Sequence, residues 1–223
     1  GGLAGRLSRE REEASRRLAT AVEQAMADLN MGGTTFAVPI ERTRSEDGLW
    51  VDEAGSIAPG GYAFDSTGID RVEFLISPNP GEDLRPLARV ASGGESTRLL
   101  LAIKSILSQA DATPTLVFDE IDVGVGGRSG HVVGEKLWEL ARQHQVICIT
   151  HLPQIAAYAE AHFSVGKAVR AGRTTASATR LEAEALIEEL ALMLGGPKVS
   201  AAHRASARQI LEQARQHRAV MEE

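Results

Sequence analysis

The sequence predicts a mixed α/β fold, and three observations support this prediction. About the first thirty residues place apolar side chains at helical spacing, whereas "TTFAVPIER", from residue 34, alternates apolar and polar side chains like a strand. Two later segments, "TPTLVFDE" and "QVICITH", are the short apolar runs that buried parallel strands show. Helical patterns lie between and after these runs. We therefore expect a mixed, largely parallel sheet flanked by helices, with a long helix at the N-terminus.

The N-terminal elements are predicted from residue spacing and glycines. Residues 3–30 form one helix, whose apolar stripe fits either a core-facing helix or the end of a coiled coil, because it is shorter than four heptads. Glycines in "MGGTT" end this helix before the first strand. A glycine-rich, acidic stretch over 45–66 is predicted to form hairpins or loops. A second strand follows in "RVEFLISPNPGE", closed by its Asn-Pro-Gly turn.

The remaining elements follow an α/β pattern. The stretch 92–108 begins with a polar cap and two glycines and then presents one apolar face, made by Leu99, Ile103, Ile106 and Leu107. Between the two apolar runs we expect a helix over 128–143. After them the sequence predicts a short helix beginning near Pro153, a hairpin turning at Ala171-Gly172, and closing helices over about 183–194 and 199–221.

Composition limits the classes of function. The 24 Lys and Arg residues against 30 Asp and Glu give a net charge of -6, so the surface as a whole is not built to bind nucleic acid. DNA contacts must be local or come from another segment. A single cysteine, Cys148, excludes an internal disulfide framework and is expected to be a packed thiol. No apolar run approaches the roughly 20 residues of a membrane span, and we expect a cytoplasmic protein.

Charged side chains end both apolar strands. Asp119 and Glu120 close the first strand and His151 closes the second. Parallel strands place their carboxyl ends at one edge of a sheet, where ligands bind. An aspartate there suits Mg²⁺, and the following glutamate suits orienting or deprotonating a water molecule. Taken alone, the Asp-Glu pair is more often a strand end with solvated acids.

The turn at Ser92, Gly93 and Gly94 is the third part of the pattern. It offers backbone N–H groups at a helix N-terminus, where an anion is favoured and glycine permits close approach. Alone, it reads more simply as a capped helix. However, Asp119 lies 24 positions after Glu95, and His151 lies 32 positions after Asp119. Three weak signals in this order favour a phosphate-binding site.

These segments resemble the motifs of ABC-type ATPases. "ASGGE" resembles the signature motif, "TLVFDE" the Walker B strand, "IDVGVGG" the D-loop and "CITH" the histidine switch. Longer stretches, including "VEFLISPNPGEDLRPLARVASGGESTRLLLAIKSIL" and "MLGGPKVSAAHRASARQIL", resemble the RecN family of bacterial ATPases that repair DNA double-strand breaks and are related to SMC proteins. Glu95 stands where transporter ATPases usually carry glutamine, which weighs against a transporter.

The resemblance implies a role for each motif residue. It implies ATP and Mg²⁺ as ligands and a head-to-head homodimer that holds two nucleotides between its subunits. Asp119 would bind Mg²⁺, Glu120 would orient the hydrolytic water, and His151 would sense the γ-phosphate. Asp122 in the D-loop would contact the second copy. The γ-phosphate held by that copy would be bound by the signature residues Ser92, Gly93, Gly94 and Glu95.

One departure from the family pattern shapes the expected architecture. The chain contains no G-x-x-x-x-G-K-[ST] sequence, the loop that holds the β- and γ-phosphates. In the resembling family that Walker A loop lies in an N-terminal lobe, before a coiled-coil arm. We therefore expect a C-terminal lobe of an ABC/SMC-type head that is inactive alone. Residues 1–32 would be the returning arm, 33–195 the head lobe and 196–223 a C-terminal helix.

The expected partners follow from the same resemblance. They are a second copy of the head, the N-terminal Walker A lobe and DNA at double-strand breaks, with a nucleoid-associated location. Two other functions remain open. Asp119, Glu120, Asp122 and His151 could hold two metals for nuclease chemistry, or the head could be a nucleotide-gated clasp that bridges DNA. A last-helix face could track phosphates, although a solvated face is favoured; it comprises Arg204, Arg208, Arg215 and Arg218.

Overall fold

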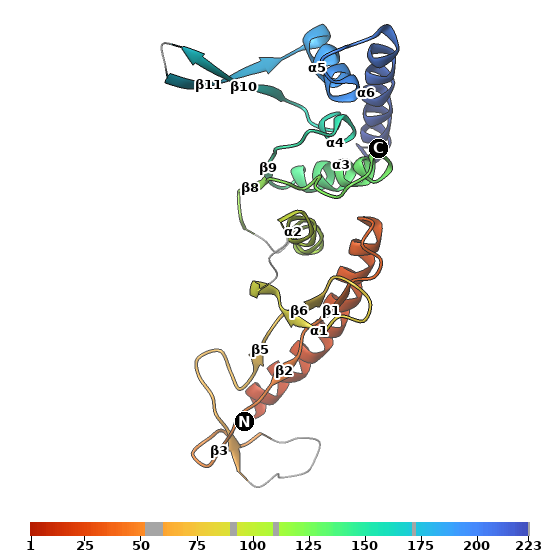
Figure 1. Ribbon diagram of the computed structural model, residues 1–223. Coiled ribbons are helices and arrows are strands. Elements are labelled where there is room, and N and C mark those ends of the chain that lie inside the picture. Colours follow the sequence, from red (N-terminus) through yellow and green to blue (C-terminus); the bar gives the residue numbers. More distant parts are fainter. Residues whose placement is uncertain (52–59, 90–92, 109–111, 171–172, 223) are drawn as a thin grey trace. The chain divides into compact units, whose positions relative to one another are not determined.

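The computed structural model describes residues 1–51, 60–89, 93–108, 112–170 and 173–222 (Figure 1). The chain divides into two compact units, Gly1–Ser92 and Gly93–Glu223. Both contain helices and strands, as the expected α/β class requires, but the described strands form small, mostly antiparallel sheets and not one largely parallel sheet. The first helix lies in the same compact unit as residues 33–92, so this division differs from the predicted arm and head. That functional division stays a prediction. No helix in the described ranges is long and apolar enough to cross a membrane.

The first unit consists of one long helix and short strands. Helix α1 (Gly2–Asp28) is followed by Asn30 in the left-handed conformation, with φ 62°. Pro39 separates two of the strands, because proline cannot donate a ladder hydrogen bond. The strands and the 3₁₀ turn are β1 (Thr35–Ala37), β2 (Ile40–Glu41), β3 (Arg44–Ser45), β4 (Gly61–Tyr62), β5 (Arg71–Val72), β6 (Leu75–Ser77), β7 (Arg85–Pro86) and η1 (Leu87–Arg89).

The C-terminal half of α1 packs on the sheet β1-β6-β7. Strands β1 and β6 are antiparallel, with Phe36 opposite Ile76. Both side chains are buried, as are Val22 and Met26 on the helix. The predicted helix over 3–30 is therefore confirmed, and its apolar stripe faces the core in its last turns. The N-terminal part is different, since Leu3 is 85% exposed.

Further towards its N-terminus, α1 is held by a buried carboxylate rather than by apolar packing. The side chain of Asp70, just before β5, has no solvent exposure. It accepts hydrogen bonds from the Ser8 hydroxyl, from Arg11 at 3.0 Å and from Arg42 at 3.1 Å. Arg42 also pairs with Glu12. Asp70 thus joins α1 to the β2-β5 ribbon.

Asp70→Asn is expected to destabilise the chain by about 3 kcal/mol, because two arginines would lose their buried counter-charge. Burial alone would raise the pKa of Asp70, but the hydrogen bonds from Ser8, Arg11 and Arg42 hold it below its ordinary value. The stabilisation is therefore present above the unfolded pKa of about 3.9 and is lost as pH falls through the lower folded pKa. Urea unfolding at pH 7 and at successively lower pH measures both effects.

The matched control is Glu73→Gln, which neutralises an exposed carboxylate three residues away. We expect it to change stability by less than about 0.5 kcal/mol. An Asp70→Asn variant as stable at pH 7 as this control would show that the buried carboxylate does not hold α1.

The second unit follows the predicted order of elements. Its helices are α2 (Gly93–Leu107), α3 (Gly127–Ala141), α4 (Pro153–Ala156), α5 (Ala183–Gly195) and α6 (Ala201–Glu222). Its strands are β8 (Thr115–Phe118), β9 (Gln145–Cys148), β10 (His162–Arg170) and β11 (Arg173–Leu181). Strands β8 and β9 pair in parallel, and β10 and β11 form the expected antiparallel hairpin (Figure 1). The turn predicted at 171–172 lies outside the described residues.

Two burial predictions were wrong. The continuous apolar run of β8 predicts a strand covered on both faces, but only Leu116 and Phe118 are buried, while Val117 is 58% exposed. Ile147 and Ile149 beside it are 47% and 51% exposed, so one face of the β8-β9 sheet is uncovered in this chain. On α2 the prediction was right for Leu99, which is buried, and in part for Ile103 and Ile106, which are half-buried, but Leu107 is 40% exposed.

Cys148 is a half-buried free thiol at the end of β9. Burial, assisted by the nearby Asp122 and Asp119 carboxylates, raises its pKa to about 12. The thiol therefore stays protonated at neutral pH and is a poor nucleophile, which agrees with the predicted packing role.

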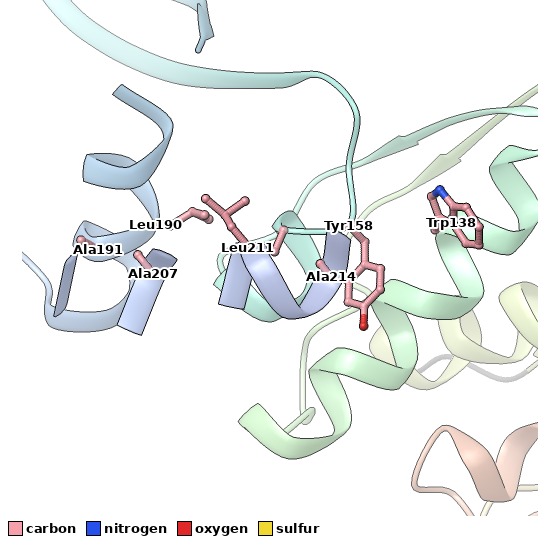
Figure 2. Close-up of a cluster of buried hydrophobic side chains, with 8 residues drawn as sticks. Trp138, Tyr158, Leu190, Ala191, Ala207, Leu211 and Ala214 are labelled. Carbon is pink, nitrogen blue, oxygen red and sulfur yellow. The ribbon is translucent and has the colours of Figure 1, made fainter. Parts of the chain in front are cut away.

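The apolar core of the second unit lies among α3, α4, α5 and α6 (Figure 2). Tyr158 packs against α3 where Gly134 makes room, since a Cβ there would overlap the tyrosine ring. The cluster consists of Trp138, Ala157, Tyr158, Leu190, Ala191, Ala207, Leu211 and Ala214. The closing helices are thus part of this core.

The arginine face of α6 is largely engaged within the chain. Arg204 pairs with Glu188, and Arg208 with Glu184 at 3.2 Å, both on the adjacent α5. Arg218 donates to the Tyr158 carbonyl oxygen at 3.5 Å. These pairs favour the solvated, locally neutralised face over a track for phosphates.

Candidate functional site

The parallel pairing of β8 and β9 brings two predicted strand ends to one edge. The register runs from Thr115 opposite Gln145 to Phe118 opposite Cys148, and Ile149 N–H extends it by donating to the Phe118 carbonyl at 2.9 Å. The residues that follow each strand, 119–120 and 150–151, therefore emerge beside one another. This confirms the topology on which the predicted crevice depends.

Asp119 and Glu120 are both exposed in the tight turn after β8. The Asp119 side chain accepts the Glu120 N–H at 2.9 Å. Glu120 has φ 58°, a left-handed conformation that is unusual and costly for a residue with a side chain. Its carbonyl accepts the Val123 N–H at 3.2 Å, so the chain folds back immediately.

Asp122 is the buried centre of the site, at 4% exposure. Its Oδ2 accepts the Thr150 hydroxyl at 2.5 Å and the His151 backbone N–H at 2.7 Å, and it lies 3.0 Å from His151 Nδ1. The resemblance implied that Asp122 contacts a second copy. That contact stays a prediction; within this chain the carboxylate is bonded to Thr150 and His151, just after β9.

The His151 ring is oriented by that contact. Its side chain is 75% exposed, and the carboxylate beside Nδ1 favours a proton on this nitrogen. Nε2 is then the nitrogen available to a ligand. Asp122, on the turn after β8, thereby sets the orientation of a side chain on the neighbouring strand.

The signature turn lies against the turn after β8. Helix α2 begins at Gly93, and Ser92, which precedes it, is outside the described residues. A Cβ on Gly93 would overlap the Glu120 carboxylate, and one on Gly94 would come within 2.7 Å of the Val123 carbonyl oxygen. Position 94 therefore needs glycine, because its neighbour is backbone, whereas a side chain at Gly93 would require only that the Glu120 side chain move. Glu95 is half-buried in the first turn of α2.

The donor set fits a phosphate and a magnesium ion. The 15-residue helix α2 presents an N-terminus without side-chain bulk at its first two residues, which suits a phosphate. Asp119 offers exposed carboxylate oxygens, the ligands that Mg²⁺ prefers. In the described ranges no three His, Cys, Asp or Glu side chains gather closely enough to hold a metal unaided. Asp119 would thus share the ion with phosphate oxygens and water.

The structure also identifies site residues that the sequence analysis missed. Thr97 donates to the Asp119 carbonyl at 3.1 Å, and Arg98 donates to the Val123 carbonyl at 2.6 Å. Thr150 bonds to Asp122. The helical period gave no signal for Arg98, because it lies outside the apolar face predicted from Leu99, Ile103, Ile106 and Leu107.

Comparison with known proteins finds relatives of this chain. No family model matches the chain. It is 39% identical over 218 residues to the DNA repair protein RecN of Streptomyces coelicolor, covering 98% of the chain and 37% of the relative. The Treponema pallidum protein is 44% identical over 217 residues, and that of Bacillus subtilis 37% over 214. Over this aligned length, the chain belongs to the RecN family. It spans little more than a third of these RecN relatives.

Solved structures show a likeness to SMC heads. A Pyrococcus yayanosii SMC head with a coiled coil is 19% identical, matching 86% of this chain and 32% of that chain, with a TM-score of 0.49. The SMC head domain of Thermotoga maritima is 19% identical. The match covers 81% of this chain and 52% of the Thermotoga chain, with a TM-score of 0.38.

Proposed function

We propose that this segment is the C-terminal lobe of a DNA repair ATPase head and hydrolyses ATP held between two heads. The observation that supports this most is the convergence of three predicted motifs at one edge of the β8-β9 sheet. Glu120 lies beside Gly93, and the turn that carries Glu120 is bonded through Asp122 to His151. Phosphoryl transfer to water needs such an arrangement: a carboxylate that accepts a proton, a side chain that contacts the phosphate, and a helix N-terminus.

The chain's own residues divide the chemistry. Glu120, exposed at the turn, would orient the attacking water and accept its proton. His151 would present Nε2 to the phosphate, with its ring held by Asp122. Asp119 would hold Mg²⁺, which when bound neutralises charge on the transferred phosphate.

The glycine turn would complete the site of another subunit. Residues 1–223 contain no lysine-bearing phosphate loop, so the nucleotide must be held by a different segment. We propose the N-terminal lobe of the same protein for that role, and a second copy as the source of the phosphate that Gly93 and Gly94 contact. The D-loop, with Asp122, Val123 and Gly124, would face that copy; Val123 and Gly124 are exposed, whereas the Asp122 carboxylate is buried.

The DNA partner is proposed from the relatives, which are named as DNA repair proteins. The net charge of -6 implies that DNA binding relies on a local patch or on the rest of the protein. We propose double-strand-break ends as the substrate, in the cytoplasm at the nucleoid.

The test uses a full-length RecN protein in which this chain replaces the matching segment of the Treponema pallidum relative, referred to below as the RecN chimera. We expect ATP turnover per head to rise with protein concentration over about a hundredfold range and then saturate, because two heads form each site. Turnover that is constant per head over that range would rule out a shared site. Absence of turnover would contradict the proposed ATPase function.

A further inference from the structure

The side chains of α2 reach across to the turn that carries the catalytic residues. Thr97 Oγ1 donates to the Asp119 carbonyl at 3.1 Å as well as to Gly93 within its own helix at 2.8 Å. One residue on, Arg98 Nη1 donates to the Val123 carbonyl at 2.6 Å. Two neighbouring residues of α2 therefore bind both ends of the segment 119–123.

Arg98 is unusual because it is buried. Its exposure is 6%, and a guanidinium is costly to bury unless polar groups compensate it. Burial lowers the pKa of Arg98, and Glu95, one helical turn earlier, opposes this. An arginine side chain nevertheless stays charged in proteins. A buried charge that donates to a carbonyl is a strong and directional link.

Close packing adds to this link. A Cβ on Gly94 would lie 2.7 Å from the Val123 carbonyl oxygen and 2.9 Å from the Val123 Cβ. The start of α2 is therefore already in contact with the turn. The turn has its own bonds, from Val123 N–H to the Glu120 carbonyl at 3.2 Å and from Val125 N–H to the Asp122 carbonyl at 3.0 Å. It is therefore a compact unit fastened to α2.

The same turn is fastened on its other side to β9. Asp122 accepts hydrogen bonds from Thr150 and His151, as described above. A continuous set of contacts thus runs from the start of α2, through residues 119–125, to His151. A displacement of α2 would be carried to the acid and to the histidine.

We propose that Arg98 is a positioning residue that couples the glycine turn at the start of α2 to Glu120 and His151. This inference rests on the proposed ATPase function. The phosphate held by a second copy binds at the glycine turn. The hydrogen bond from Arg98 to Val123 then keeps Glu120 and His151 aligned with that phosphate. Without that link the two heads still meet, but the acid and the histidine are no longer aligned for hydrolysis.

The first test is Arg98→Ala in the RecN chimera. We expect kcat to fall about tenfold or more, because small misplacements of catalytic groups are costly, while the KM for ATP stays within about twofold. ATP-dependent dimerisation, measured by light scattering, is expected to persist. Arg98→Lys should restore part of kcat, since an ammonium can still donate to the Val123 carbonyl but lacks the planar fork.

The matched control is Leu99→Ala, which removes the adjacent buried side chain of α2 and leaves the Val123 contact in place. It should lower stability, with kcat per folded head little changed. Equal loss of kcat in both variants, or an unchanged kcat in Arg98→Ala, would overturn the proposal. Loss of dimerisation in proportion to turnover would also overturn it, because Arg98 would then serve the glycine turn alone.

Hydrogen exchange on the same chimera separates this inference from the proposed function. Arg98→Ala should speed exchange of the Val123 and Val125 amides about tenfold, whereas Leu99→Ala should affect α2 first. Unchanged exchange at the turn would refute the fastening role even if ATP is hydrolysed. If the unaltered chimera does not hydrolyse ATP, the proposed function fails, and the exchange result still decides whether Arg98 holds the turn.

Discussion

Glu120→Gln is expected to lower ATP turnover of the RecN chimera by at least about a hundredfold, because the amide cannot accept a proton from the attacking water. The glutamine is nearly isosteric, so it can occupy the space beside Gly93 where the carboxylate lies. Binding of ATP and association of the heads should therefore survive, and ATP should remain trapped. Steady-state turnover and retention of labelled ATP on the dimer measure the two effects.

The control for this prediction is Glu160→Gln, an exposed carboxylate in the same unit, just after α4. It should leave turnover unchanged. If Glu120→Gln hydrolyses ATP as fast as this control, Glu120 is not the catalytic acid or base, and the assignment of the "LVFDE" strand end fails with it.

Asp122→Asn is expected to have the second-largest effect on turnover. Oδ2 of Asp122 serves the Thr150 hydroxyl, the His151 N–H and His151 Nδ1. An amide has one oxygen and brings two donors of its own, so part of this set loses its acceptor. We expect about 2 kcal/mol of lost stability and a fall in kcat of between about tenfold and a hundredfold, because the ring of His151 is no longer held.

Urea unfolding and steady-state kinetics of the RecN chimera give the two readouts for Asp122→Asn. Asp83→Asn, at an exposed site in the first unit, is the control and should change neither. A stability loss without a change in kcat would mean that Asp122 supports the fold but does not position His151.

Much of the architecture could be predicted because it follows from the hydrophobic periodicity and from the positions of glycine and proline. The apolar runs ending at Phe118 and Cys148 predicted parallel strands, and parallel strands necessarily bring Asp119 and His151 to one edge. The direction of the Asp122 side chain could not be predicted. It depends on the left-handed backbone conformation at Glu120, and a glutamate in the sequence gives no sign of that conformation.

The errors in burial have a different cause. This chain spans little more than a third of its RecN relatives, and in the proposed head the N-terminal lobe would cover the exposed face of β8 and β9. Val117 and Ile147 are therefore apolar, as residues at buried positions are, but they are exposed in this chain. Arg98 was missed for another reason. Its role depends on a hydrogen bond to the Val123 carbonyl, which only the fold brings close.

The uncovered face of β8 and β9 also bears on how such a protein is made. A ribosome releases the N-terminal part of a chain first, and domains generally fold as they emerge. In the architecture that the resemblance implies, the Walker A lobe precedes this segment and would be folded when β8 leaves the ribosome. Val117, Ile147 and Ile149 would then be exposed only briefly. Encoding the two lobes as separate chains would remove that protection and leave newly made copies free to adhere to one another through this face.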